Sequence, residues 1–106
     1  MGYSVRVTEA FEDDLFGVLA YLIEACGANG AAERIVQEVD RAKALLAVQP
    51  FIRAASKKSR LGDFAYREHF IKGYVIVYRM SGEEVLFLRF FHQTQLYERF
   101  VMEWDQ

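Results

Sequence analysis

Residues 64–91 read FAYREHFIKGYVIVYRMSGEEVLFLRFF, and this stretch decides the fold. It contains three segments that are rich in β-branched and aromatic residues: 64–71, 74–80 and 84–91. Only Lys72-Gly73 separates the first two, and only Ser81-Gly82-Glu83 separates the last two. Glycine accepts the positive φ angles of tight turns, and connections this short join antiparallel neighbours. The stretch therefore predicts a three-stranded antiparallel meander.

A strand and a helix are predicted ahead of the meander. Residues 3–8 alternate between apolar and polar side chains, as a half-buried strand does. Thr8 suits the N-cap of a following helix, because its hydroxyl can accept a hydrogen bond from a free N–H of the first turn. Gly27 and Gly30 are expected to break this helix. Its apolar residues recur at helical spacing: Phe11, Leu15, Val18 and Leu22.

A second helix is predicted over residues 31–49. Pro50 is expected to end it, because proline disfavours helical geometry in the residue before it. The short link between the two helices predicts an antiparallel hairpin. Residues 94–104 carry apolar side chains at helical spacing and predict a short final helix. The apolar stripe of the second helix consists of Ile35, Val39, Ala42 and Leu46.

These elements predict an α+β fold in a single domain, residues 1–106. Its parts are an N-terminal strand, an antiparallel helical hairpin, a three-stranded antiparallel meander that completes the sheet, and a short C-terminal helix. The hairpin must bury its apolar stripe, and one face of the sheet is its only sizeable partner. The other face is expected to serve as a concave binding surface or to meet a protein partner.

Composition limits the classes of function. The net charge is −2 and the pI is about 5.7, whereas proteins that grip nucleic acid broadly are usually basic. Cys26, the single cysteine, is expected to be a buried apolar thiol. No apolar run approaches the roughly 20 residues of a membrane span, so the cytoplasm is the expected location. No metal or cofactor is expected, because the sequence has no clustered metal ligands.

Several short motifs follow one another along the chain. They are Tyr3-Ser4-Val5-Arg6-Val7-Thr8, Ala10, Asp14-Leu15, Tyr21-Leu22, Leu46, Pro50, Tyr66-Arg67-Glu68, Gly73-Tyr74-Val75-Ile76-Val77-Tyr78-Arg79 and Leu88-Arg89-Phe90-Phe91-His92. In this order and spacing, nearly the whole chain resembles the RelE/ParE superfamily of toxins, especially its ParE-like plasmid-stabilisation members. The resemblance implies the RelE/ParE-like fold. It also implies the toxin of a type II toxin–antitoxin addiction module, which inhibits growth until a cognate antitoxin neutralises it.

The resemblance leaves the target and the assembly open. ParE-like members inhibit DNA gyrase, and RelE-like members cleave mRNA on the ribosome, so either target is a possible partner besides the antitoxin. A degenerate toxin that only binds its antitoxin is a third interpretation. Both a homodimer and a toxin–antitoxin hetero-oligomer are compatible with the sequence.

The nuclease interpretation depends on a few residues of the meander and tail. In the RelE pattern a catalytic arginine follows the Gly-Tyr of the middle strand, but here that place holds Val75. His92, with Tyr97 five residues later, is a candidate acid–base group. Arg67 is the candidate cation for the charged transition state of a metal-independent endoribonuclease. The alternative is that His92 merely ends a strand, and Val75 with the acidic pI favours the ParE-like interpretation.

Cations of the sheet are candidate target-binding residues. Arg67, Arg79 and Arg89 fall on three neighbouring predicted strands. Together with His69 they are predicted to line one patch. The alternative is ordinary solvated charge, paired with carboxylates of the same strands and turns: Glu68, Glu83 or Glu84.

A second group of cations lies in a predicted loop ahead of the meander. Lys57, Lys58 and Arg60 follow Arg53 within eight positions. Such a cluster can bind phosphates or an acidic protein surface. The alternative is that it only keeps an exposed loop solvated.

Overall fold

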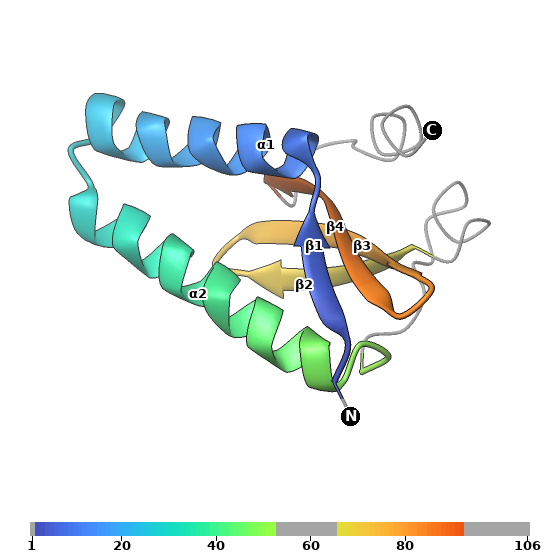
Figure 1. Ribbon diagram of the computed structural model, residues 1–106. Coiled ribbons are helices and arrows are strands. Elements are labelled where there is room, and N and C mark those ends of the chain that lie inside the picture. The colour runs from blue at the N-terminus through green and yellow to red at the C-terminus, as the bar shows by residue number, and fades with distance from the viewer. Residues whose placement is uncertain (1, 53–65, 93–106) are drawn as a thin grey trace.

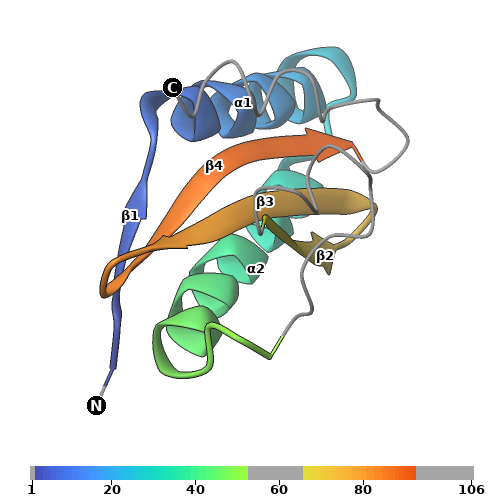
Figure 2. The same cartoon turned by 90° about the vertical axis from the view of Figure 1, so that its right-hand side faces the viewer.

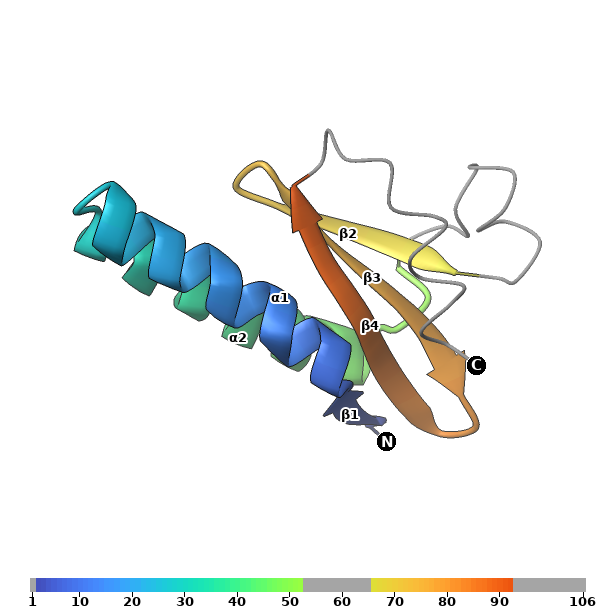
Figure 3. The ribbon, with the colours of Figure 1, turned by 90° about the horizontal axis from the view of Figure 1, so that it is seen from above.

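The computed structural model of the protein describes residues 2–52 and 66–92. The elements in chain order are β1 (Ser4–Val7), α1 (Glu9–Ala20), the π-helix η1 (Tyr21–Ala25), α2 (Asn29–Val48), β2 (Arg67–Ile71), β3 (Tyr74–Ser81) and β4 (Glu84–His92). The α+β fold that the sequence predicts is confirmed, with both helices on one face of the sheet (Figures 1 and 3). The predicted final helix at residues 94–104 lies outside the described residues.

The four strands form one sheet in the order β1-β4-β3-β2. The predicted meander is confirmed, because β2, β3 and β4 pair antiparallel. Lys72 and Gly73 both have positive φ angles, of 47° and 85°, as a two-residue hairpin turn requires. β1, which precedes the helical hairpin in the chain, lies at the edge of the sheet and pairs parallel with β4 (Figure 2).

Thr8 joins α1 to the edge of β4. Its hydroxyl accepts a hydrogen bond from the Phe11 N–H at 3.0 Å, which confirms the predicted N-cap. The same hydroxyl donates to the Leu88 carbonyl at 2.8 Å, and the Thr8 N–H donates to the Phe87 carbonyl at 3.0 Å. One residue therefore starts the helix and continues the pairing of β4 beyond the end of β1.

The turn between the helices differs in detail from the prediction. Gly27 has a φ of 62° and ends the first helical segment as expected. Gly30, however, lies inside α2, which begins at Asn29. Gly30 is in the first turn of α2, where the conformational freedom of glycine costs less than in the middle of a helix. The end of α2 at Val48, just ahead of Pro50, agrees with the prediction.

Apolar side chains are buried on both faces of the sheet. On the helix face, the main cluster consists of Phe11, Ile35, Val39, Ala42, Leu46, Ile71, Ile76, Tyr78, Val85, Phe87 and Phe90. A second buried cluster consists of Tyr66, Val75, Val77, Leu86, Leu88 and Phe91. The face of the sheet away from the helices therefore also carries buried apolar side chains. The central strands β3 and β4 are almost continuously apolar, which is typical of strands buried on both faces.

Cys26 lies at the tip of the helical hairpin and is exposed, so the expectation of a buried thiol was wrong. It follows η1, beyond the apolar stripe that packs on the sheet. A hydrogen bond between its thiol and the Tyr21 hydroxyl raises the pKa of Tyr21 above its ordinary value. Among the described residues, no helix is long and apolar enough to cross a membrane.

Candidate functional site

The middle strand of the sheet holds an apolar side chain where a RelE-like nuclease has its arginine. Val75 is completely buried in the second apolar cluster and lies opposite Phe91 of β4. A guanidinium at this position would have to enter an apolar cluster at a cost of several kcal/mol. The position therefore serves the packing of the sheet.

The cations of the sheet do not form the single patch that the sequence predicts. Arg67 lies opposite Tyr78, a member of the cluster on the helix face. Its guanidinium is 5.0 Å from the ring centre of Phe51. Arg79 lies opposite Leu86, a member of the second cluster. Because paired residues share a face of the sheet, Arg67 and Arg79 lie on opposite faces.

His69 shares the helix face with Arg67 but is buried, with 6% of its surface exposed. It borders a hollow of about 460 Å³ between α2 and β2. The other residues that line this hollow are Glu38, Arg41, Ala42, Leu45, Phe70, Ile71 and Lys72. Arg41 and Glu38 form an ion pair there at 2.9 Å. His69 is thus near charged groups of α2, and the sheet separates it from Arg79.

Arg89 is held by Asp14 of α1. Its Nε and one terminal nitrogen donate to the two carboxylate oxygens at 2.6 and 2.9 Å. Asp14 also accepts a hydrogen bond from the Phe90 N–H at 3.0 Å. Only 12% of the Arg89 side chain and 17% of the Asp14 side chain are exposed. The carboxylate that holds Arg89 thus belongs to Asp14 of α1, whereas only Glu68, Glu83 and Glu84 were expected from the sequence as partners of the sheet cations. Arg89 fastens α1 to β4.

The sequence contained an indication that Asp14 would need a hydrogen-bonding or charged partner. Asp14 follows Phe11 by three residues and precedes Val18 by four, so it borders the apolar stripe of its helix. A carboxylate beside a buried stripe needs a cation or several N–H donors. Its partner lies 75 positions away, however, and helical spacing alone does not identify it.

His92 is the exposed last residue of β4. It lies opposite Tyr74, and the two rings meet edge to face with centroids 5.5 Å apart. Arg67 pairs with Tyr78, four positions along β3 from Tyr74, which is about 13 Å along the strand direction. His92 and Arg67 are therefore too far apart along the strands to act on the same phosphate group of an RNA.

The remaining candidates fall outside the part of the chain that the structure describes. These are Tyr97 and the cluster of Lys57, Lys58 and Arg60, with Arg53. Within the described ranges, no three His, Cys, Asp or Glu side chains are grouped so that they could hold a metal ion.

Comparisons with known proteins add to this geometry. A family model described as ParE toxin of type II toxin–antitoxin system, parDE, matches residues 5–97. A solved structure titled chromosomal ParDE TA system from P. aeruginosa is similar, with 19% sequence identity and a TM-score of 0.66. The match covers 85% of this chain and 95% of that chain, and it supports the fold. A comparison with curated proteins finds no match. Because the family model spans most of the sequence, the chain belongs to the ParE toxin family of type II toxin–antitoxin systems.

Proposed function

We propose that this protein inhibits bacterial growth by binding DNA gyrase, and that it carries out no covalent chemistry of its own. The observation that carries the proposal is the buried Val75 at the centre of the sheet. It occupies the position at which the RelE pattern has a catalytic arginine. Membership of the ParE family supports the same choice.

The arrangement of charge also favours a binding role over RNA cleavage. A pentavalent phosphate needs fixed cations close to one another and close to an acid–base group. In the described part of the sheet, Arg67 and Arg79 are on opposite faces, and the charge of Arg89 is balanced by Asp14. His92 is displaced from Arg67 along the strands, so these residues make a poor nuclease site.

The residues proposed for target contact are Lys57, Lys58, Arg60 and Arg79. Their charges suit an acidic protein surface. Arg89 and His69 are removed from this set, because both side chains are largely buried and Arg89 is engaged by Asp14. A cognate antitoxin partner agrees with the family, and we propose a toxin–antitoxin hetero-oligomer as the resting state.

Two assays on one preparation test the proposal. The purified protein should inhibit DNA supercoiling by gyrase and should leave translated mRNA uncut in primer extension. His92→Ala should keep most of the inhibition, because His92 only ends a strand. Arg79→Gln should weaken it more than the matched variant Arg6→Gln, since Arg6 is exposed and pairs with Glu84.

Three results would count against the proposal. Codon-phased cuts that disappear in His92→Ala, together with normal supercoiling, would establish a ribonuclease. Normal supercoiling and intact mRNA, together with retained antitoxin binding, would establish a degenerate toxin. Equal inhibition by Arg79→Gln and wild type would remove Arg79 from the target surface.

A further inference from the structure

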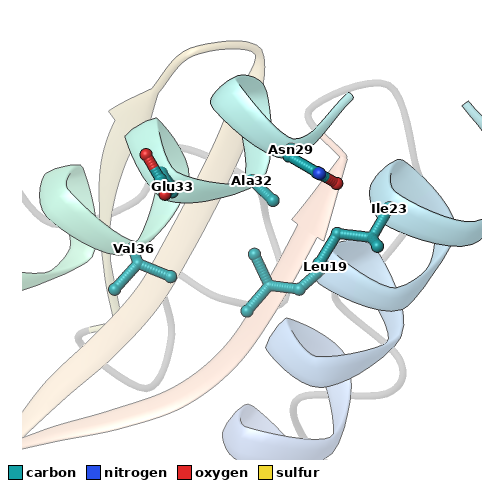
Figure 4. Close-up of a pocket in the computed structure, with 6 residues that line it drawn as sticks. All are labelled: Leu19, Ile23, Asn29, Ala32, Glu33 and Val36. Atoms are coloured by element: carbon teal, nitrogen blue, oxygen red, sulfur yellow. The ribbon is translucent and has the colours of Figure 1, made fainter. Parts of the chain in front are cut away.

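Two hollows border α2, and their linings differ in charge. The hollow between the helices has a volume of about 420 Å³, and mainly apolar side chains line it, with Asn29 and Glu33 but no lysine or arginine (Figure 4). The hollow between α2 and β2 has a volume of about 460 Å³, and charged side chains line both of its walls. These are Glu38 and Arg41 of α2, and Lys72 directly after β2. We name this second one the β2 hollow.

The β2 hollow also contains a buried imidazole. His69 is 6% exposed, and among the residues that the structure describes it is the one buried polar side chain. It lies opposite Ile76 of the main cluster, so its ring is on the face of the sheet that α2 covers. A buried polar group says more about function than an exposed apolar one. Because an imidazole nitrogen can donate a hydrogen bond, His69 can contact a ligand deep in the hollow.

The lining of the β2 hollow carries more positive than negative charge. Glu38 is its carboxylate, and it accepts a hydrogen bond from one terminal nitrogen of Arg41 at 2.9 Å. Arg41 keeps further donors, because every nitrogen of a guanidinium carries N–H groups. Lys72 is exposed, and no carboxylate within the described ranges pairs with it. The charge of Lys72 is therefore in excess, which favours an anion.

The donors of the β2 hollow come from different elements. Arg41 belongs to α2, His69 to β2, and Lys72 to the turn between β2 and β3. Lys72 has a φ of 47° in a two-residue hairpin turn, so the backbone of the turn restricts the direction of its side chain. A phosphate group has acceptor oxygens on several sides, whereas those of a carboxylate lie in one plane. Donors on separate walls therefore suit a phosphate better.

The other residues that line the β2 hollow are apolar: Ala42, Leu45, Phe70 and Ile71. Ala42 and Ile71 are buried members of the main cluster. Such a surface can cover an apolar group of a ligand but leaves a polar one without hydrogen bonds. The volume is in the lower part of the range of about 300–1,000 Å³ for small-molecule sites. The ligand is thus expected to be small and partly apolar.

We propose that the β2 hollow binds a small organic phosphate monoester. Its phosphate contacts Arg41, Lys72 and His69, and its apolar group packs against Leu45 and Ile71. A nucleic-acid strand is a poorer match, because it is held by several phosphate contacts, and the excess of positive charge in the hollow is small. The hollow contains none of the residues proposed for target contact. The inference therefore holds or fails independently of the gyrase target.

Titrations of the full-length protein, followed by proton–nitrogen NMR spectra, test the class of ligand. The probe is phenyl phosphate, which has both parts of the proposed ligand. Inorganic phosphate lacks the apolar group, and phenol lacks the anion. Phenyl phosphate should bind at least about tenfold more tightly than either, and more weakly at higher salt. The backbone amide signals of Arg41 and of residues 69–72 should shift.

Substitutions of single charges locate the phosphate. Lys72→Asn removes a cation and preserves the turn, because Asn-Gly is favoured in two-residue hairpin turns. It should lower the affinity for phenyl phosphate at least about fivefold, and so should Arg41→Gln. Glu38→Gln should raise the affinity, since it removes the competing carboxylate. Arg34→Gln is the matched control, because Arg34 is exposed on α2 but does not line the hollow.

The contact of His69 has a separate readout. The chain has two histidines, so His69 is the remaining one in His92→Ala. Its ring nitrogen signals can then be assigned without ambiguity, and they should move when phenyl phosphate is added. The amide spectrum of each variant shows at the same time whether it is folded.

Several outcomes would overturn the proposal. If inorganic phosphate bound as tightly as phenyl phosphate, the apolar wall would have no role, and if phenol did, the cations would have none. Binding that survives both Lys72→Asn and Arg41→Gln, or that leaves the His69 ring signals unmoved, would place the site elsewhere. Tighter binding of a 5′-phosphorylated oligonucleotide would assign the hollow to nucleic acid. Absence of binding at millimolar phenyl phosphate would show that the hollow has no such ligand.

Discussion

The two ends of α1 with η1 differ in what they contact, although they belong to one continuous helical segment. The starting end is fastened to β4 by the Thr8 hydroxyl and by the Asp14 carboxylate. The far end, η1, has no buried residue and contains the exposed Ile23, and Cys26 directly after it is exposed as well. The start of the helix therefore holds the fold together, while its far end contributes an exposed surface.

The largest effect on stability is expected in the main buried cluster, against which the start of α1 packs. Val39→Asp should unfold the protein, because an unpaired charge in the core costs several kcal/mol, comparable with the stability of a small domain. Leu15→Asp should cost less, because Leu15 is only partly buried against the same cluster. Thermal denaturation followed by circular dichroism measures both. An unchanged melting temperature for Val39→Asp would show that the main cluster does not hold the fold.

The second-largest effect on stability is expected at the Asp14–Arg89 ion pair, which joins α1 to β4. Asp14→Ala should destabilise the protein by about 3 kcal/mol or more, because it leaves the largely buried Arg89 without its carboxylate. Glu84→Ala is the matched control, since it breaks the exposed Arg6–Glu84 pair and should cost less than about 1 kcal/mol. Urea unfolding of both variants gives the two values. Equal losses would mean that the Asp14–Arg89 pair is no more important than a surface pair.

The smallest effect on stability is expected at the tip. Ile23→Asp should change the free energy of unfolding by less than about 0.5 kcal/mol, because the side chain is already half exposed. The same urea measurement applies, and Val39→Asp is the contrasting variant in α2. If Ile23→Asp lowered the free energy of unfolding as much as Asp14→Ala, both ends of the helical segment would contribute equally to stability.

Local features of the sequence predicted most of the fold correctly. The turns at Lys72-Gly73 and Ser81-Gly82, the N-cap at Thr8 and the stripe from Ile35 to Leu46 all depend on residues that are neighbours in sequence. Such features follow from backbone conformations and from side-chain periods, which a sequence displays directly. The absence of an arginine after Gly73-Tyr74 was equally visible.

The candidate site was predicted less well, because it depends on register between strands. Alternation along a strand says which side chains share a face within that strand, but not how strands align. The ladder of β3 and β4 is irregular between Val77 and Tyr78. Arg89 consequently lies opposite Val77, whereas an unbroken ladder would place it opposite Ile76. One extra residue in β4 thus changed the face of a candidate binding residue.

The sequence by itself determined the helices, the meander and the acidic, apolar character of α1, since each rests on local periodicity and composition. Only the tertiary structure decided the parallel pairing of β1 with β4, the Asp14–Arg89 ion pair and the irregular register between β3 and β4. It also decided that Ile23 of η1 and Val36 of α2 border one hollow between the helices. The physical reason is distance along the chain. Contacts between residues tens of positions apart depend on how whole elements pack, and no local pattern encodes that packing.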